Sequence, residues 1–90
     1  MSADANHDEV EWRLVILGQA IRGFREQRGV STDRLAARTG KTPQRIRELE
    51  AGELDPGYEE LGVLAEKGLG VRLSTLVAYA ARRERRPTSP

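Results

Sequence analysis

Cysteine is absent from this 90-residue sequence, and histidine occurs once, as His7 in a polar stretch near the N-terminus. The chain therefore offers no disulfide and no thiolate or imidazole cluster that would hold a metal ion. Aromatic residues are scarce, with one Trp, two Tyr and one Phe, so the core must consist mainly of Leu, Ile, Val and Ala. No apolar run approaches the ~20 residues that a membrane-spanning helix needs.

The lack of cysteine and the single histidine also argue against catalysis. The glycines form no phosphate-binding loop, and the adjacent acids Glu59 and Glu60 point to different sides of a helix. We therefore expect no enzymatic activity, no cofactor and no metal. The acidic N-terminal stretch, MSADANHDE, lacks an apolar signal core, so we expect the protein to be cytoplasmic.

The formal net charge of +1 hides a segregation of charge along the chain. Residues 1–11 carry four acids and no base, whereas residues 12–47 carry nine bases and two acids. Residues 48–66 carry seven acids and no base, and residues 67–90 carry six bases and one acid. A basic block of this kind is typical of nucleic-acid binding, although ordinary solvated helix faces can cluster in the same way.

The spacing of apolar residues predicts an all-α domain. From residue 9 to about residue 27, apolar residues recur every three or four positions and share one helix face. Gly18 and Gly23 inside this helix predict the close approach of another helix. We divide the chain into a disordered acidic N-terminus (1–8), a helical domain (9–81) and a basic, flexible tail (82–90).

The stretch from Thr32 to Gly52 predicts two short helices joined by a tight turn. Ser31 can cap the first helix, and Gly40 suits the left-handed residue that ends it. Thr42 can cap the second helix, and Pro43 suits its first position, where a missing N–H costs nothing. This combination is typical of a helix-turn-helix, although a purely structural helix corner can show the same pattern.

Around this motif the sequence resembles the phage-repressor/Cro-type helix-turn-helix family, also called the XRE family. The resemblance covers roughly residues 17–77 and is carried by LGQAIRGFREQRGVS, LAARTGKTPQRIRELEAG and LGVRLSTL. It implies a compact all-α five-helix bundle of the lambda-repressor-like type, with the motif on the second and third helices. It also implies that the third helix, about Thr42–Glu50, lies in the major groove of DNA.

The resemblance also implies roles for individual residues. Arg25 and Glu50 match a partly buried ion pair that joins the first and third helices in relatives; two unpaired surface charges are the alternative. The positions implied to contact bases hold Pro43, Gln44, Arg47 and Glu48, although Glu48 can equally be an exposed carboxylate. The candidates for phosphate contacts are Ser31, Thr32, Arg38, Lys41 and Arg45.

Two departures from the family pattern bear on these roles. Glu53 and Asp55 stand where relatives often carry basic residues, which removes one source of affinity for phosphate. One extra residue precedes the LGV segment, which predicts a bulge at the end of the fourth helix or a shifted fifth helix. We expect that fourth helix over about Tyr58–Lys67 and the fifth from near Ser74 or Thr75.

We therefore expect a sequence-specific regulator that binds double-stranded DNA as a homodimer and represses transcription. The alternative is an antitoxin or adaptor whose main role is to bind a protein partner, such as a toxin or an antagonist. Either role needs a contact face, and the apolar residues considered for it are Trp12, Val15, Ile16, Leu73, Leu76, Val77 and Ala80. For the first three, covering the edge of the core is the alternative.

Overall fold

The computed structural model describes the backbone of residues 2–84 and the side chains of residues 12–82. Within that part of the chain every regular element is helical. This confirms the predicted all-α bundle, with the helix-turn-helix on α2 and α3. The elements are α1 (Ser2–Gln27), α2 (Thr32–Thr39), α3 (Pro43–Glu50), α4 (Tyr58–Val63), η1 (Leu64–Leu69) and α5 (Leu73–Glu84).

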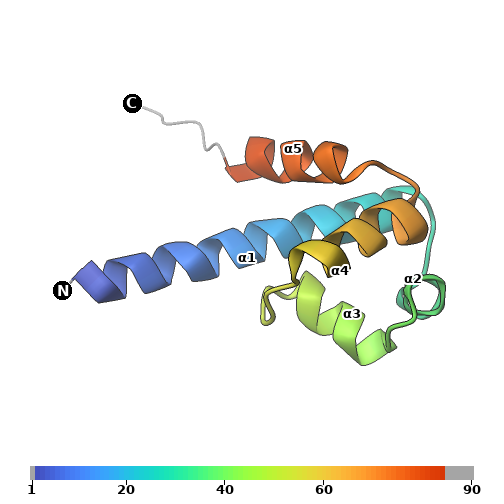
Figure 1. Cartoon of the computed structure of the whole chain (residues 1–90), viewed down its shortest axis with the longest axis horizontal. Helices are drawn as coiled ribbons and strands as arrows, with labels where there is room; N and C mark the ends of the chain where they lie inside the picture. The colour runs from blue at the N-terminus through green and yellow to red at the C-terminus, as the bar shows by residue number, and fades with distance from the viewer. Residues whose placement is uncertain (1, 85–90) are drawn as a thin grey trace.

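Helix α1 begins at Ser2 rather than near Glu9, so the helix includes residues 2–8 in the structure. These residues contain neither glycine nor proline. Adding a residue to a helix that already exists costs far less than starting a new one, so nothing in this stretch stops the helix. Figure 1 shows the consequence: the N-terminal turns of α1 project beyond the other helices.

The helix-turn-helix follows the predicted capping residues. The Ser31 hydroxyl accepts a hydrogen bond from the Arg34 backbone N–H at 3.0 Å, and Gly40 ends α2 in the left-handed conformation with φ of 70°. The Thr42 hydroxyl accepts from the Arg45 backbone N–H at 3.1 Å, and Pro43 is the first residue of α3. Each cap satisfies an N–H that the helix itself leaves unpaired.

The core is aliphatic and lies where α1, α2, α3, η1 and α5 meet. Its largest fully buried side chains are Ile21, Leu35, Ile46, Leu49, Leu64 and Leu76. Phe24 packs at the edge of this core against Tyr79, with ring centroids 4.8 Å apart. Branched side chains therefore compensate for the scarcity of aromatic residues, and the short α4 contributes Leu61, which packs against the core.

The fourth helix changes its hydrogen-bonding pattern partway along. It is α-helical over α4 and then continues as a π-helix over η1, ending at Gly70 with φ of 72°. A π-turn accommodates one additional residue without breaking the helix, which is how the structure absorbs the extra residue noted before LGV. The predicted bulge is therefore confirmed, and it extends two residues past the predicted end at Lys67.

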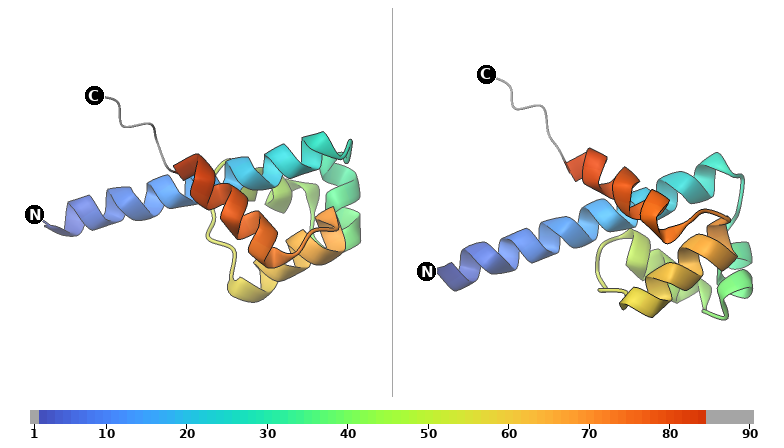
Figure 2. Two further views of the ribbon diagram at one scale, coloured as in Figure 1. Left: turned by 90° about the horizontal axis from the view of Figure 1, so that it is seen from above. Right: turned by 45° about the horizontal axis from the view of Figure 1, so that its top comes forward.

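The helices form two groups around α1. Helix α5 lies along one side of α1, whereas α2, α3 and α4 gather on the other side near its C-terminal half (Figure 1). The two further views in Figure 2 agree on this arrangement and show α5 crossing α1 obliquely. Helix α5 begins at Leu73, slightly earlier than predicted. Residues 85–90 of the predicted flexible tail lie outside the described residues, while residues 82–84 belong to α5.

Candidate nucleic-acid interface

Helix α3 buries one face and leaves the other for a ligand. Ile46 and Leu49 are buried in the core, which turns Gln44 and Arg47 outward as exposed side chains. Pro43 and Glu48 are half-buried beside them. Because residues three and four apart share a helix face, these four side chains form one edge along α3, polar except for Pro43. The structure thus brings together all four residues predicted to contact bases.

Gln44 is held in place by Glu48. Its amide Nε2 donates a hydrogen bond of 2.8 Å to a Glu48 carboxylate oxygen. A glutamine amide has two N–H donors and a carbonyl acceptor, so this bond leaves one donor and the acceptor of Gln44 available. Glu48 thus accepts a hydrogen bond from a neighbouring residue predicted to contact bases.

Arg25 and Glu50 lie together although 25 residues separate them in the chain. Arg25 donates two hydrogen bonds to the Glu50 carboxylate, from Nε at 2.6 Å and from Nη2 at 3.0 Å, and a third to the Val30 carbonyl at 3.0 Å. The side chains are only 13% and 8% exposed. The hydrogen bonds to Glu50 raise the pKa of Arg25 above its ordinary value, so the guanidinium stays charged. The pair ties α1 to the C-terminal end of α3.

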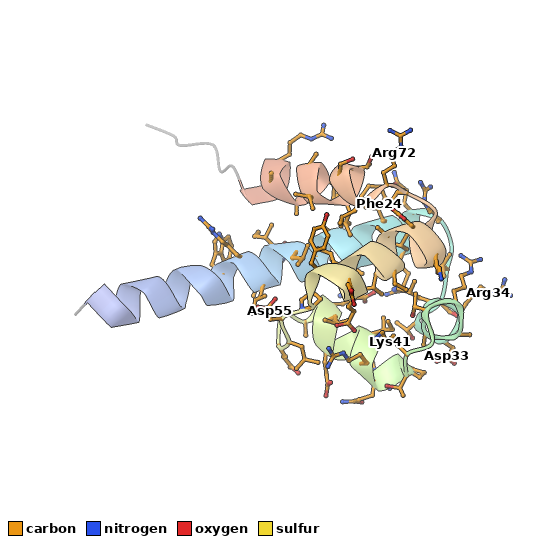
Figure 3. All side chains as sticks on the ribbon, in the orientation of Figure 1. Phe24, Asp33, Arg34, Lys41, Asp55 and Arg72 are labelled. Carbon is orange, nitrogen blue, oxygen red and sulfur yellow. The ribbon has the colours of Figure 1, made fainter. Side chains whose placement is uncertain are left out.

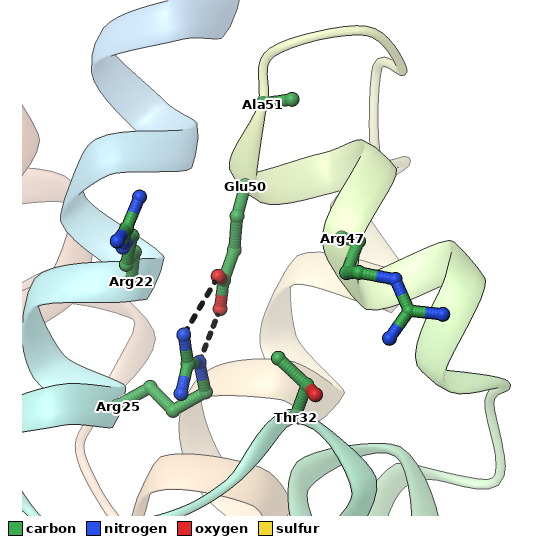
Figure 4. Close-up of a pocket in the computed structure, with 6 residues that line it drawn as sticks. All are labelled: Arg22, Arg25, Thr32, Arg47, Glu50 and Ala51. Atoms are coloured by element: carbon green, nitrogen blue, oxygen red, sulfur yellow. Dashed lines mark hydrogen bonds and ion pairs between the residues drawn. The ribbon is translucent and has the colours of Figure 1, made fainter.

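A pocket of about 290 Å³ opens beside this ion pair. It is lined by Arg22, Arg25, Thr32, Arg47, Glu50 and Ala51. Figure 4 shows Thr32 near the start of α2 and Arg47 on α3, on the other side of the pocket from Arg25. Sequence reasoning singled out Thr32 and Arg47 but missed Arg22. Its position on α1, one turn before Arg25, was the available signal.

The five residues predicted to contact phosphates are differently placed. Ser31 caps α2 and Thr32 lines the pocket. Arg38 donates from Nη1 to the Gly68 carbonyl at 3.0 Å. Lys41 and Arg45 both turn toward Glu60 on α4, at 3.5 Å and 2.8 Å. The three basic members of the set thus already contact α4 or η1.

Sequence reasoning assigned no role to Glu60. The hydrogen bond from Arg45, with the charges of Arg45 and Lys41, holds the pKa of the Glu60 carboxyl below its ordinary value despite its burial. The same hydrogen bond raises the pKa of Arg45. Glu60 lies 15 residues from Arg45 in the chain and on a different helix, so no local periodicity connects the two.

The loop between α3 and α4 carries the two acids that depart from the family pattern. Glu53 and Asp55 are both exposed, and Figure 3 shows Asp55 on this loop near the end of α3. Between them Leu54 is half-buried against the core. The exposed carboxylates repel phosphate rather than bind it, so affinity for a polyanion must come from other residues.

The apolar face considered for a partner is largely used within the chain. Ile16 and Leu76 are buried at 5% and 0% exposure, so they belong to the core and not to a partner face. Leu73 and Ala80 pack against the core, and Val15 lies against Gly52. Trp12 and Val77 remain exposed, at 38% and 47%.

The described residues contain no group of three or more His, Cys, Asp or Glu side chains that would hold a metal ion. Among residues 2–84, no helix is both long and apolar enough to cross a membrane.

A capped helix pair that presents a polar α3 edge beside a basic pocket defines the class of helix-turn-helix DNA-binding proteins. A family model described as a helix-turn-helix domain matches residues 16–76, and the chain belongs to that family.

Among the solved structures that share the fold are two of the clp gene regulator ClgR from Corynebacterium glutamicum. The first is 29% identical over 81% of this chain and 94% of that chain, with a TM-score of 0.76. The second is 30% identical over 79% of this chain and 74% of that chain, with a TM-score of 0.75. No curated protein sequence matches the chain.

Proposed function

We propose that this protein is a sequence-specific transcriptional regulator that binds double-stranded DNA and acts as a repressor. The observation that carries the proposal is the α3 edge, where Gln44 and Arg47 are exposed beside the pocket at the start of α2. Placing α3 in the major groove brings both side chains to base edges. Occupying a promoter in this way blocks transcription without further chemistry. The likeness to ClgR, whose name describes a gene regulator, supports the same reading.

Base recognition follows from the chemistry of the α3 edge. The free donor and acceptor of Gln44 suit adenine, which offers N7 and the N6 amino group in the major groove. Arg47 suits guanine, whose O6 and N7 accept two hydrogen bonds. Pro43 offers an apolar surface to a thymine methyl. Glu48 contributes by holding the Gln44 amide in a defined orientation.

Backbone contacts are proposed for the pocket. Thr32 lies at the start of α2, where backbone N–H groups and the helix dipole favour an anion. Arg22 and Arg47 add positive charge at the same place. A phosphate bound there sets the register of α3 in the groove but carries no sequence information.

We further propose that the protein acts as a homodimer. A single small domain buries a limited area on DNA, and two-fold subunits read two half-sites about one helical turn (~34 Å) apart. The exposed apolar side chains Trp12 on α1 and Val77 on α5 provide the contact. The charge of residues 1–11 is opposite to that of residues 67–90, which favours association of one copy with another.

The experiment that tests this function is selection of bound sequences from random duplex DNA by the full chain. A recovered palindrome supports the proposal. Arg47→Gln should then cost about 1–3 kcal/mol at the operator and relax the preference at one base position. Arg72→Gln, which removes a charge near α5 and far from α3, should not (Figure 3). Recovery of no sequence overturns the proposal and favours the antitoxin or adaptor role.

A further inference from the structure

We propose that Glu60 is a positioning residue for DNA specificity: it withholds Arg45 and Lys41 from the phosphate backbone and so weakens binding to random sequences. The inference rests on the proposed DNA-binding function and deepens it. It assigns a role to Glu60, an acidic residue outside the helix-turn-helix. Arg45 and Lys41 are then not available as phosphate-binding cations of the helix-turn-helix.

The contacts of Glu60 are complete on both of its oxygens. Arg45 donates from Nη2 to Oε1 at 2.8 Å and from Nε to Oε2 at 3.0 Å, and Lys41 Nζ lies 3.5 Å from Oε2. A bidentate pair between guanidinium and carboxylate is among the stronger side-chain interactions in proteins. The Glu60 side chain is 9% exposed, whereas those of Arg45 and Lys41 are 39% and 34% exposed.

This difference in burial makes it unfavourable for a phosphate to bind Arg45. If Arg45 turned away to a phosphate, the carboxylate of Glu60 would stay almost buried with one cation fewer, which is costly. A phosphate that approached Arg45 in place would instead meet the negative charge of Glu60 behind it. Either route weakens the attraction that Arg45 and Lys41 would otherwise exert.

The consequence for specificity follows from how the two kinds of binding arise. Binding to random DNA depends on cations that neutralise phosphates, whereas discrimination depends on contacts with base edges. Gln44 and Arg47 carry the proposed base contacts, and neither touches Glu60 in the recorded interactions of the described residues. Glu60 therefore weakens the phosphate contacts that bind random DNA and leaves the proposed base contacts unchanged.

The direct test is Glu60→Gln, measured by fluorescence anisotropy with a random duplex over a range of salt concentrations. Freeing one or two cations should steepen the dependence of log K on log salt by about 0.9 per cation, tighten random binding and reduce the operator-to-random ratio. Glu59→Gln is the matched control, because it changes the net charge equally. Glu59 is exposed and has no ion pair among the described residues. Glu59→Gln should leave the salt slope unchanged.

Two outcomes overturn the inference. If Glu60→Gln weakens operator and random DNA alike with an unchanged slope, Glu60 is only structural. If Glu59→Gln steepens the slope as much as Glu60→Gln does, net charge explains the effect.

Circular dichroism reveals whether Glu60→Gln folds. If it does not fold, a second variant, Arg45→Gln, still tests whether Arg45 binds phosphate. Arg45→Gln should leave the salt slope of the wild-type background unchanged, because Arg45 contacts no phosphate there. A slope that flattens by about 0.9 would show that Arg45 binds phosphate despite Glu60 and would overturn the inference. In a folded Glu60→Gln background, the same substitution should remove about 0.9 from the steepened slope.

Failure of this inference differs from failure of the proposed function. A wild-type chain that selects no DNA sequence overturns both. A wild-type chain that selects an operator, but whose Glu60→Gln variant keeps the original slope, overturns the role of Glu60 alone.

Discussion

At the scale of residues, two ion pairs that α1 arginines make with glutamates show how burial changes the contribution of an ion pair to stability. Arg25–Glu50 is nearly buried and joins two helices, whereas Arg22–Glu26 lies within one helix with side chains 63% and 56% exposed. Water screens the exposed pair, and its contribution to stability is small. Removing one partner of the buried pair leaves a charge that water cannot solvate.

We therefore predict that Glu50→Gln lowers the free energy of unfolding by about 3–5 kcal/mol, because Arg25 loses its counter-charge while the guanidinium stays largely buried. Glu26→Gln is the control, and it should change the free energy by less than about 1 kcal/mol. Urea unfolding at neutral pH measures both. Equal effects of the two substitutions would contradict the difference in burial.

Glu60 gives a prediction about pH. Its carboxyl has a pKa below the ordinary value of 4.5 in the folded chain, mainly because of the hydrogen bond from Arg45. The folded state thus favours the ionised form, and this stabilisation is complete above the unfolded pKa and is lost as pH falls through the folded pKa. Urea midpoints measured from neutral pH to below pH 4.5 should fall in the wild type and fall less steeply in Glu60→Gln. Glu59→Gln should keep the wild-type dependence.

At the scale of elements, α1 and α3 approach each other closely at Gly18. A Cβ added there would collide with the backbone carbonyls of Leu49 and Glu50. Carbonyls at the end of a helix cannot move aside as a flexible side chain can. The predicted close approach at Gly18 is thus confirmed. The buried ion pair and the α3 edge both depend on this contact.

We predict that Gly18→Ala destabilises the chain by about 1–3 kcal/mol, because overpacking outweighs the better helix propensity of alanine. Gly62→Ala in α4 is the matched substitution. Its Cβ would meet only Leu73 at 4.0 Å, so propensity alone should stabilise the chain by up to about 1 kcal/mol. Thermal unfolding measures both variants: Gly18→Ala should lower the melting temperature and Gly62→Ala should raise it. A stabilising Gly18→Ala would refute the close approach.

At the scale of the whole molecule, the proposed homodimer depends on apolar side chains that the core leaves exposed. Val77→Glu should weaken self-association by more than tenfold, since an unpaired carboxylate in an interface costs more than about 1.4 kcal/mol. Thr75→Glu lies on another side of α5 and is the control. Sedimentation over a concentration series measures both, and an unchanged Val77→Glu dimer would exclude this face.

The sequence by itself determined the local features of this protein. Ser31, Gly40, Thr42 and Pro43 specify where α2 and α3 begin and end, because caps act on neighbouring backbone groups. The apolar spacing predicted an all-α domain. The extra residue, found by comparison with the family pattern, predicted a bulge or a shifted fifth helix, and the structure shows the bulge as η1. The ion pair of Arg25 and Glu50 came from family resemblance, because no local rule connects residues so far apart.

Only the tertiary structure decided which charges are available to DNA. Sequence reasoning considered Lys41 and Arg45 for phosphate contacts. It considered Ile16 and Leu76 for a partner face, with the edge of the core as the alternative for Ile16. The fold instead brings Glu60 against the two cations and buries the two apolar residues. The physical reason is that ion pairing and burial depend on distances between helices, and packing of the core sets those distances.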